Sequence, residues 1–220
     1  MSRRCAYFGN PWIGMFVKSN DSFTFIPVDS THKLEGAVKE NLHTQVEKVL
    51  LGGSNLLGAY VAMNSSGAIL PNVATNEEME IFKSAGLNVY QASETANAHG
   101  NNISVNDKGG LINPHISKKE RMLMQDALGV ELVPMYIARF ATVGSCCLAG
   151  NNGFLVHYSA SDEEVKKIND VLKVSGERGT VNMGIGFVSC GIVANKHGYI
   201  AGEASRAFEL GRAESALGYI

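Results

Sequence analysis

The 220-residue sequence lacks an excess of charge of either sign, with 19 basic residues, 21 acidic residues and a formal net charge of −2. Proteins that hold nucleic acid mainly through its phosphates normally carry a basic excess, so any nucleic-acid contact is expected to be secondary to a protein contact. No segment approaches the roughly 20 consecutive apolar residues that span a bilayer. With 45% hydrophobic and 18% charged residues, the composition is typical of an ordered globule. We therefore expect a cytoplasmic protein with no membrane contact.

Metal-binding and catalytic motifs are missing as well. The four cysteines include no C-x-x-C pair and the six histidines no H-x-x-x-H pair, so we expect neither a metal nor any other cofactor. Residues 52–54 (GGS) lack the Gly-Lys-Ser/Thr that completes a phosphate-binding loop, and residues 184–186 (GIG) stop short of G-x-G-x-x-G. Cysteines of cytoplasmic proteins stay reduced. Four buried thiols are therefore expected: Cys5, Cys146, Cys147 and Cys190.

What the sequence does contain is a fivefold internal repeat. Equivalent turn residues recur at spacings of 44, 43, 43 and 45 residues: Phe23, Gly67, Gly110, Gly153 and Gly198. A period this regular predicts a repeat architecture. In each unit a glycine, replaced by Ser189 in the fifth, is expected to open a strand, and an Asn turn leads to a second apolar strand. The turn asparagines include Asn64, Asn106, Asn151 and Asn195.

A helix is predicted after each hairpin, and three of these helices begin with a capping box. In a capping box a Ser or Thr and a Glu three residues later each satisfy a backbone donor of the first helical turn. The three pairs are Thr75 with Glu78, Ser117 with Glu120, and Ser161 with Glu164. A third strand is predicted after each of the first four helices, within residues 46–51, 88–92, 131–138 and 174–181.

The two ends of the chain complement each other. Residues 5–8 (CAYF) form an apolar strand with no helix before it, whereas the last helix, around residues 208–217, has almost no chain after it. Neither end has the polar outer face that the terminal units of an open array need. We therefore predict an α+β fold in which five strand-strand-strand-helix units close into a ring, with residues 1–220 forming a single domain.

Five short motifs accompany this period: residues 9–14 (GNPWIG), 142–145 (TVGS), 179–184 (GTVNMG), 209–212 (ELGR) and 216–218 (ALG). Together with the repeats, they resemble the archaeal branch of the translation initiation factor 6 family over essentially the whole chain. The resemblance implies a pentein fold with pseudo-fivefold symmetry and a monomeric, non-enzymatic protein. It further implies binding to the intersubunit face of the large ribosomal subunit beside the sarcin-ricin loop, mainly through ribosomal proteins and secondarily through ribosomal RNA. A protein bound there blocks joining of the small subunit.

The candidate ribosome-binding residues follow the glycine that opens each of the first four units, which places them at one end of the ring: Met15, Ala59, Asn101 and Ser145. Asn101 matches a family position associated with ribosome binding, although an Asn after Gly100 can equally cap a turn. The chain departs from the family at residues 205–207 (SRA), which leaves Glu203 and Arg206 open as contacts, and at residues 96–99 (ANAH).

Two other classes of protein stay open at this stage. Penteins also include guanidine-modifying enzymes with a Cys nucleophile, and the only combination available here is Cys190 with His157 or His197. Units of about 44 residues leave little room for the inserted loops that roof such a site. A scaffold ring without ribosomal ties differs from the favoured interpretation only by the family resemblance.

Overall fold

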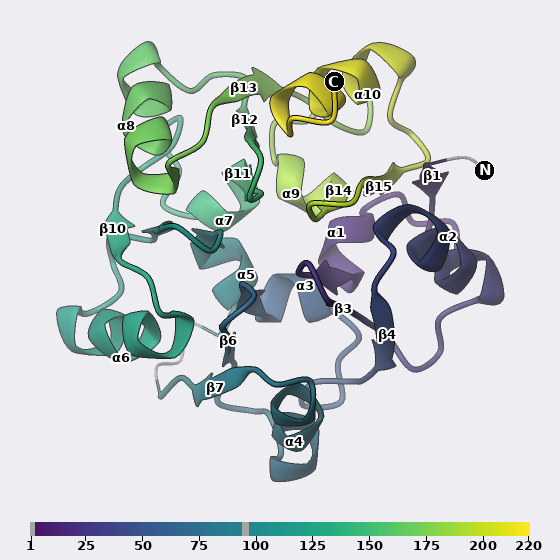
Figure 1. Ribbon diagram of the computed structural model, residues 1–220, viewed down its shortest axis with the longest axis vertical. Coiled ribbons are helices and arrows are strands. Elements are labelled where there is room, and N and C mark those ends of the chain that lie inside the picture. The colour runs from purple at the N-terminus through teal and green to yellow at the C-terminus, as the bar shows by residue number, and fades with distance from the viewer. Residues whose placement is uncertain (1–2, 94–96) are drawn as a thin grey trace.

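The computed structural model describes residues 3–93 and 97–220, and in this part of the chain fifteen strands form five three-stranded sheets around a central axis (Figure 1). The arrangement is the pseudo-fivefold pentein ring that the repeats predict. The sheets are β2 (Lys18–Ser19), β3 (Phe23–Ile26) and β4 (Gln45–Lys48); β5 (Ala62–Met63), β6 (Gly67–Leu70) and β7 (Asn88–Gln91); β8 (Ile103–Val105), β9 (Gly110–Ile112) and β10 (Leu132–Pro134); β11 (Cys147–Ala149), β12 (Phe154–His157) and β13 (Gly176–Gly179); and β14 (Ile192–Ala194), β15 (Tyr199–Gly202) and β1 (Arg4–Cys5).

Long helices line the perimeter of the ring and one-turn helices line its centre (Figure 1). The perimeter helices are α2 (His32–Leu42), α4 (Asn76–Ser84), α6 (Lys118–Leu128), α8 (Asp162–Leu172) and α10 (Ala207–Ala216). The central helices are α1 (Ile13–Phe16), α3 (Leu57–Tyr60), α5 (His99–Asn102), α7 (Val143–Cys146) and α9 (Val188–Gly191). The central helices correct one prediction. The repeated glycine does not open a strand but lies in a helical turn before it, because the neighbouring helix packs directly against the glycine backbone.

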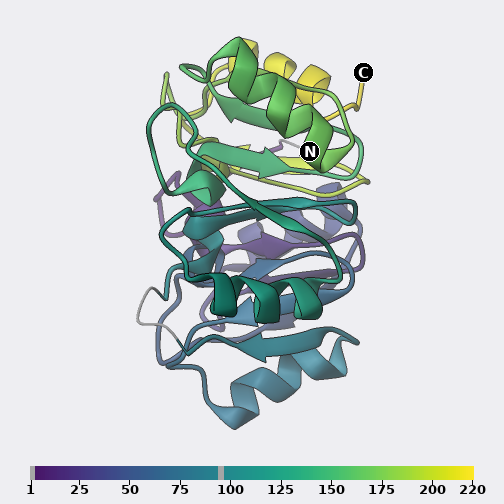
Figure 2. The same ribbon diagram turned by 90° about the vertical axis from the view of Figure 1, so that its left-hand side faces the viewer.

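Every unit is built in the same way. Its first two strands are antiparallel, and its third strand pairs in parallel with the second, as Phe154 opposite Gly176 illustrates. In the first four units the third strand follows the perimeter helix, whereas in the fifth unit the N-terminal β1 takes its place. The strands run along the axis of the ring, from one face of the disc to the other (Figure 2). We call the face with the turns at residues 20–22, 64–66, 106–109, 150–152 and 195–197 the hairpin face. The opposite face, where the central helices and the N-termini of the perimeter helices lie, is the short-helix face.

The hydrophobic core lies between neighbouring units rather than inside each one. Phe25 of the first unit stacks on Phe82 of the second, with ring centroids 4.1 Å apart, and both side chains are fully buried. Likewise, Leu34 of α2 packs in one cluster with Ile200 of β15. Because each unit buries its apolar surface against the next, the units stabilise one another, as in other repeat proteins.

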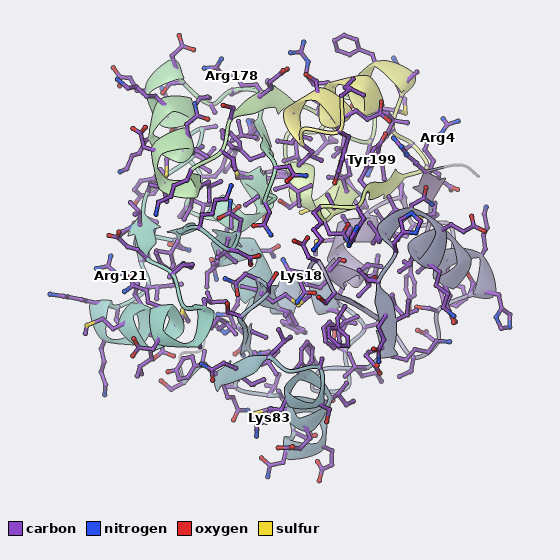
Figure 3. All side chains as sticks on the ribbon, in the orientation of Figure 1. Arg4, Lys18, Lys83, Arg121, Arg178 and Tyr199 are labelled. Atoms are coloured by element: carbon purple, nitrogen blue, oxygen red, sulfur yellow. The ribbon has the colours of Figure 1, made fainter. Side chains whose placement is uncertain are left out.

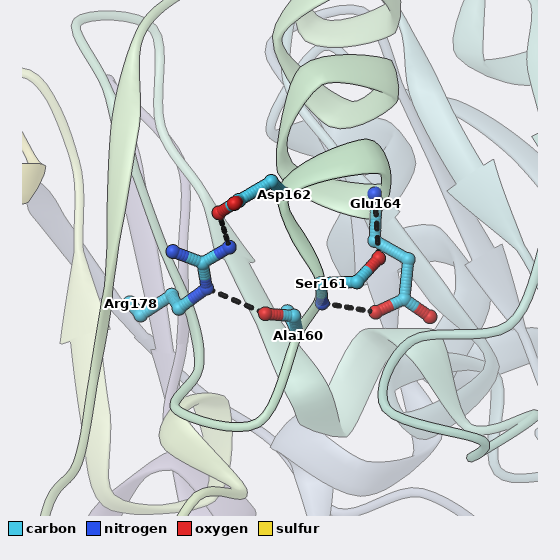
Figure 4. A network of polar contacts seen from close by, with 5 residues as sticks. All are labelled: Ala160, Ser161, Asp162, Glu164 and Arg178. Carbon is cyan, nitrogen blue, oxygen red and sulfur yellow. Dashed lines mark hydrogen bonds and ion pairs between the residues drawn. The ribbon is translucent and has the colours of Figure 1, made fainter.

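Two of the three predicted capping boxes are complete. Thr75 and Glu78 form one, and Ser161 and Glu164 form the other (Figure 4). At the third, the Ser117 hydroxyl accepts from the backbone N–H of Glu120, but the Glu120 carboxylate does not return to the cap. It instead accepts from the N–H and hydroxyl of Ser93 and from the Tyr90 hydroxyl. The N-terminal strand completes the fifth sheet as predicted, because β1 pairs in parallel with β15. It is shorter than the predicted strand over residues 5–8, because the chain turns between Tyr7 and Asn10.

Candidate functional site

The central helices pack against one another through bare backbone. A Cβ atom on Gly58 would lie 1.8 Å from the carbonyl oxygen of Gly14, and one on Gly100 would lie 1.9 Å from that of Gly58. The same contact continues from Gly144 to Gly100, at 2.2 Å, and from Gly14 to Ser189, at 1.8 Å. Side chains at the four glycines would therefore force the helices apart. These contacts make the centre of the short-helix face a tightly packed ring.

The four predicted ribosome-binding residues each follow one glycine of this ring, so the structure brings them to the same end of the axis. They differ in accessibility. Met15 and Asn101 are partly exposed, whereas Ala59 and Ser145 are only 5% and 7% exposed. Only Met15 and Asn101 therefore offer an appreciable side-chain surface to a partner. The fifth position of the set is Cys190, which the repeat register would have identified.

Exposed apolar side chains surround the ring on the same face, and the search for ring positions missed them. Phe8 and Met183 are 64% and 61% exposed, and Phe140 is 40% exposed. Each lies in a tight turn between a third strand and a central helix, closed by backbone hydrogen bonds such as the pair between Tyr7 and Asn10. Phe8 (φ 49°) and Met183 (φ 69°) adopt left-handed backbone conformations that are uncommon for bulky residues. A sequence signal was available, since Met183 lies within the quoted GTVNMG motif.

Carboxylates at the third position of three perimeter helices hold the turns of Phe140 and Met183, and the equivalent turn at Gly52, in place. Glu78 accepts from the N–H of Gly52, and Glu164 accepts from the N–H of Ala138 at 3.1 Å. Glu209 accepts from the N–H groups of Met183 and Gly184 at 3.2 and 2.8 Å. Burial alone raises the pKa of Glu209, but these hydrogen bonds outweigh it and the pKa is lowered. These three turns are thus anchored before any partner arrives.

An aromatic cluster extends the apolar surface over the fourth unit. Phe140 lies 5.0 Å from Phe187 and 5.5 Å from His157, centroid to centroid, and His157 stacks on Tyr158 at 4.6 Å. His157 is buried, which lowers the pKa of its imidazole, while Tyr158 is 55% exposed. This cluster gives the short-helix face a large aromatic surface next to the Phe140 turn.

The candidate cysteine nucleophile lacks a suitable base. Burial raises the pKa of Cys190, which keeps it a thiol. His197 lies at a turn on the hairpin face, where its Nε2 contacts the carbonyl oxygen of Asp21 at 3.2 Å, at the opposite end of the axis from α9. His157 Nδ1 accepts from the N–H of Ser159 and its ring packs in the aromatic cluster. A nucleophile needs a base within hydrogen-bonding reach, and neither histidine is paired with Cys190 in the described residues.

Asparagine side chains connect the units on the hairpin face. Asn64 Nδ2 donates to the carbonyl oxygens of Asn106 and Leu128, and its Oδ1 accepts from two N–H groups of its own turn. Asn106 and Asn195 form equivalent bonds, which confirms them as turn residues. Asn151 is different, because Gly150 occupies the equivalent position. Its Nδ2 instead donates to carboxylate oxygens of Asp21 and Asp107.

Within the described ranges, 3–93 and 97–220, no three His, Cys, Asp or Glu side chains are grouped so that they could hold a metal ion. The same part of the chain contains no helix of the length and apolar character that crossing a membrane requires.

Comparison with known proteins identifies the relatives of this ring. The model of the eIF-6 family matches residues 2–216. The chain belongs to the eIF-6 family. It is 36% identical to Translation initiation factor 6 of Pyrobaculum arsenaticum over 211 residues, which covers 96% of each chain. It is 32% identical to Translation initiation factor 6 of Picrophilus torridus, over 99% of this chain and 100% of the relative. The protein of the same name from Haloquadratum walsbyi is 33% identical over 99% of this chain and 96% of its own.

The two segments that are expected from the sequence to depart from the family pattern, residues 96–99 and 205–207, both adjoin the short-helix face. Residues 205–207 lead into α10, where Arg206 is the N-cap residue and the neighbouring Phe208 is 76% exposed. Residues 97–99 lead into α5, and Ala96 lies outside the described residues.

Proposed function

We propose that this eIF-6 family protein binds the intersubunit face of the large ribosomal subunit through its short-helix face and thereby blocks joining of the small subunit. The observation that carries the proposal is the combination, on one face, of a glycine-packed ring and protruding apolar side chains in anchored turns. A steric block needs a stiff body and a shaped surface, and it needs no nucleophile.

The chemistry of the face favours a protein partner. Phe8, Phe140 and Met183 can each bury an apolar side chain in a pocket of a ribosomal protein, with polar turn residues forming the rim. A net charge of −2 favours such contacts over extensive phosphate binding, so contacts to ribosomal RNA near the sarcin-ricin loop are secondary. In this proposal residues 1–220 act in the cytoplasm as one monomeric body, with Met15 and Asn101 at the centre of the contact.

A subunit-joining assay on sucrose gradients tests the proposal. Saturating protein is expected to shift large and small subunits from the joined to the separate peaks, and to co-sediment with the large subunit. Unchanged joining at saturation would refute the anti-association function. The Cys190→Ala variant should block joining as well as the wild type, since no step depends on the thiol.

Two matched methionines test which face docks. Met183 lies on the short-helix face and is 61% exposed, whereas Met122 lies on α6 at the perimeter and is 52% exposed. Met183→Asn keeps a residue that tolerates the left-handed conformation, and together with Phe8→Asn it is expected to weaken binding to the large subunit at least about tenfold, as for loss of apolar hot spots. Met122→Asn should bind as the wild type does. Equal effects of the two changes would rule out the short-helix face.

A further inference from the structure

An axial cavity of about 70 Å³ extends from the glycine ring toward the hairpin face. At the glycine end it is bordered by Gly14, Ser189 and other members of the ring. At the hairpin end, Asn151 Nδ2 bridges the carboxylates of Asp21 and Asp107, which also border the cavity, at 2.8 and 2.7 Å. This volume has room for a few water molecules or one small ion.

One lysine breaks the fivefold pattern of the cavity wall. Lys18 of β2 lies near the centre of the ring (Figure 3) and lines the cavity. The residues at the equivalent position of the other units are uncharged: Ala62, Ser104, Leu148 and Val193. Among the described residues, the Lys18 ammonium forms neither a hydrogen bond nor an ion pair. Burial lowers its pKa to about 8, so it is still mostly protonated at neutral pH.

A second unpaired donor comes from the fifth unit. The Ser189 hydroxyl is buried without a hydrogen-bond partner among the described residues, at the one ring position that is not glycine. Ser189 and Cys190 are among the residues that border the same cavity as Lys18. An ammonium without a partner inside a cavity and a buried hydroxyl without one are both unfavourable, and native proteins normally satisfy such groups with protein, water or an ion.

We propose that the axial cavity holds a small monovalent anion of about the size of chloride, bound by the Lys18 ammonium and the Ser189 hydroxyl. Of the five equivalent positions in the ring, only that of Lys18 carries a positive charge, and the ion neutralises it. A tetrahedral dianion such as phosphate is disfavoured, because only one ammonium faces it and the carboxylates of Asp21 and Asp107 at the hairpin end of the cavity repel it. Lys18 belongs to the first unit and Ser189 to the last, so the anion links the two units between which the ring closes.

Bromide is the probe, because it has the charge and nearly the size of chloride and scatters anomalously. Crystals of the wild-type protein soaked in sodium bromide are expected to show one anomalous peak beside Lys18 Nζ, and Lys18→Met crystals to show none. Lys108→Met is the matched control, since Lys108 lies at the cavity mouth, where its Nζ donates to the carbonyl oxygen of Asn151. The control should keep the peak. A cavity holding only water, or a peak that survives in Lys18→Met, overturns the proposal.

Thermal unfolding gives a second measurement in solution. Sodium bromide should raise the Tm of the wild type and of Lys108→Met above that in sodium gluconate of equal ionic strength, because a ligand bound only to the folded state stabilises it. Lys18→Met should lose this difference, and Ser189→Gly, which restores the residue of the other units, should reduce it. The same Tm rise with sodium phosphate would refute a monovalent site. Subunit joining does not enter either measurement, so this site and the proposed function can fail separately.

Discussion

His99 is expected to make the protein labile to mild acid. It is 1% exposed, and neither ring nitrogen has a hydrogen-bond partner among the described residues. Burial lowers its pKa from 6.5 to about 4, although the facing carboxylate of Glu120 acts to raise it. The equivalent residues of the other units are fully buried and aliphatic: Ile13, Leu57, Val143 and Val188. The imidazole is therefore an unsatisfied polar group at a position built for an aliphatic side chain.

The magnitude follows from linkage. The unfolded chain takes up a proton at His99 below about pH 6.5, but the folded protein does so only below about pH 4. The folded state therefore loses no stability through protonation of His99 above about pH 6.5, and it loses stability progressively as the pH falls toward 4. Over the whole interval the loss is about 3 kcal/mol, at about 1.4 kcal/mol per pH unit. Between about pH 7.5 and pH 5 it is about 2 kcal/mol.

The test is His99→Leu, which replaces the ring with an aliphatic side chain of similar volume. At about pH 7.5 the variant should be about 1–3 kcal/mol more stable, because two unsatisfied buried polar atoms are removed. Its advantage should grow by about 2 kcal/mol at about pH 5, measured by urea unfolding. His32→Gln, at an exposed histidine, should follow the wild type at both pH values. An advantage for His99→Leu that stays constant with pH would refute the reasoning.

Three further substitutions test the ring, the hairpin face and the helix caps. Gly58→Ala should destabilise the fold by more than about 3 kcal/mol in chemical denaturation, since its Cβ would meet the Gly14 carbonyl oxygen. The control Gly36→Ala, at an open position on α2, should stabilise the fold by about 0.5–1 kcal/mol. Similar effects of the two changes would argue against backbone packing at the centre. Asn106→Ala should cost about 2–3 kcal/mol, because the carbonyls of Gly150 and Leu172 in the fourth unit lose their donor. A neutral result in the same assay would show that the asparagine contacts do not hold the units together. Thr75→Ala should lower the free energy of unfolding by about 1 kcal/mol through loss of the α4 cap. An unchanged denaturation midpoint would count against a stabilising capping box.

The period and the turn chemistry were enough to predict the ring. The regular spacing from Phe23 to Gly198 predicted five units. The two apolar ends predicted that the first strand closes the ring, which it does through the pairing of β1 with β15. These features are predictable because hydrophobic alternation, Asn turns and helix caps are local. The central helices were missed for the opposite reason. A single helical turn has almost no periodicity, and the contact of Gly58 with Gly14 that requires it joins residues of different units.

The candidate site was only partly predictable. Register placed Met15 and Asn101 correctly on one face, but it could not reveal that Ala59 is covered by neighbouring helices. Phe8 and Met183 were missed because a bulky residue in a left-handed turn has no local sequence pattern, and the GTVNMG motif that contains Met183 indicated only the family. Glu120 shows the same limit, since a capping-box sequence formed only half of the box when Ser93 and Tyr90 competed for its carboxylate.

The two-residue pairing of Arg4–Cys5 with Ala201–Gly202 has a consequence for how the chain folds. The other four sheets contain only strands that follow one another along the sequence, so they can assemble while synthesis is still under way. The fifth sheet must wait for nearly the last residues to emerge and then find a partner about 200 residues back. Contacts of such long range form more slowly than contacts inside one unit, and until the first and last strands meet the ring stays open.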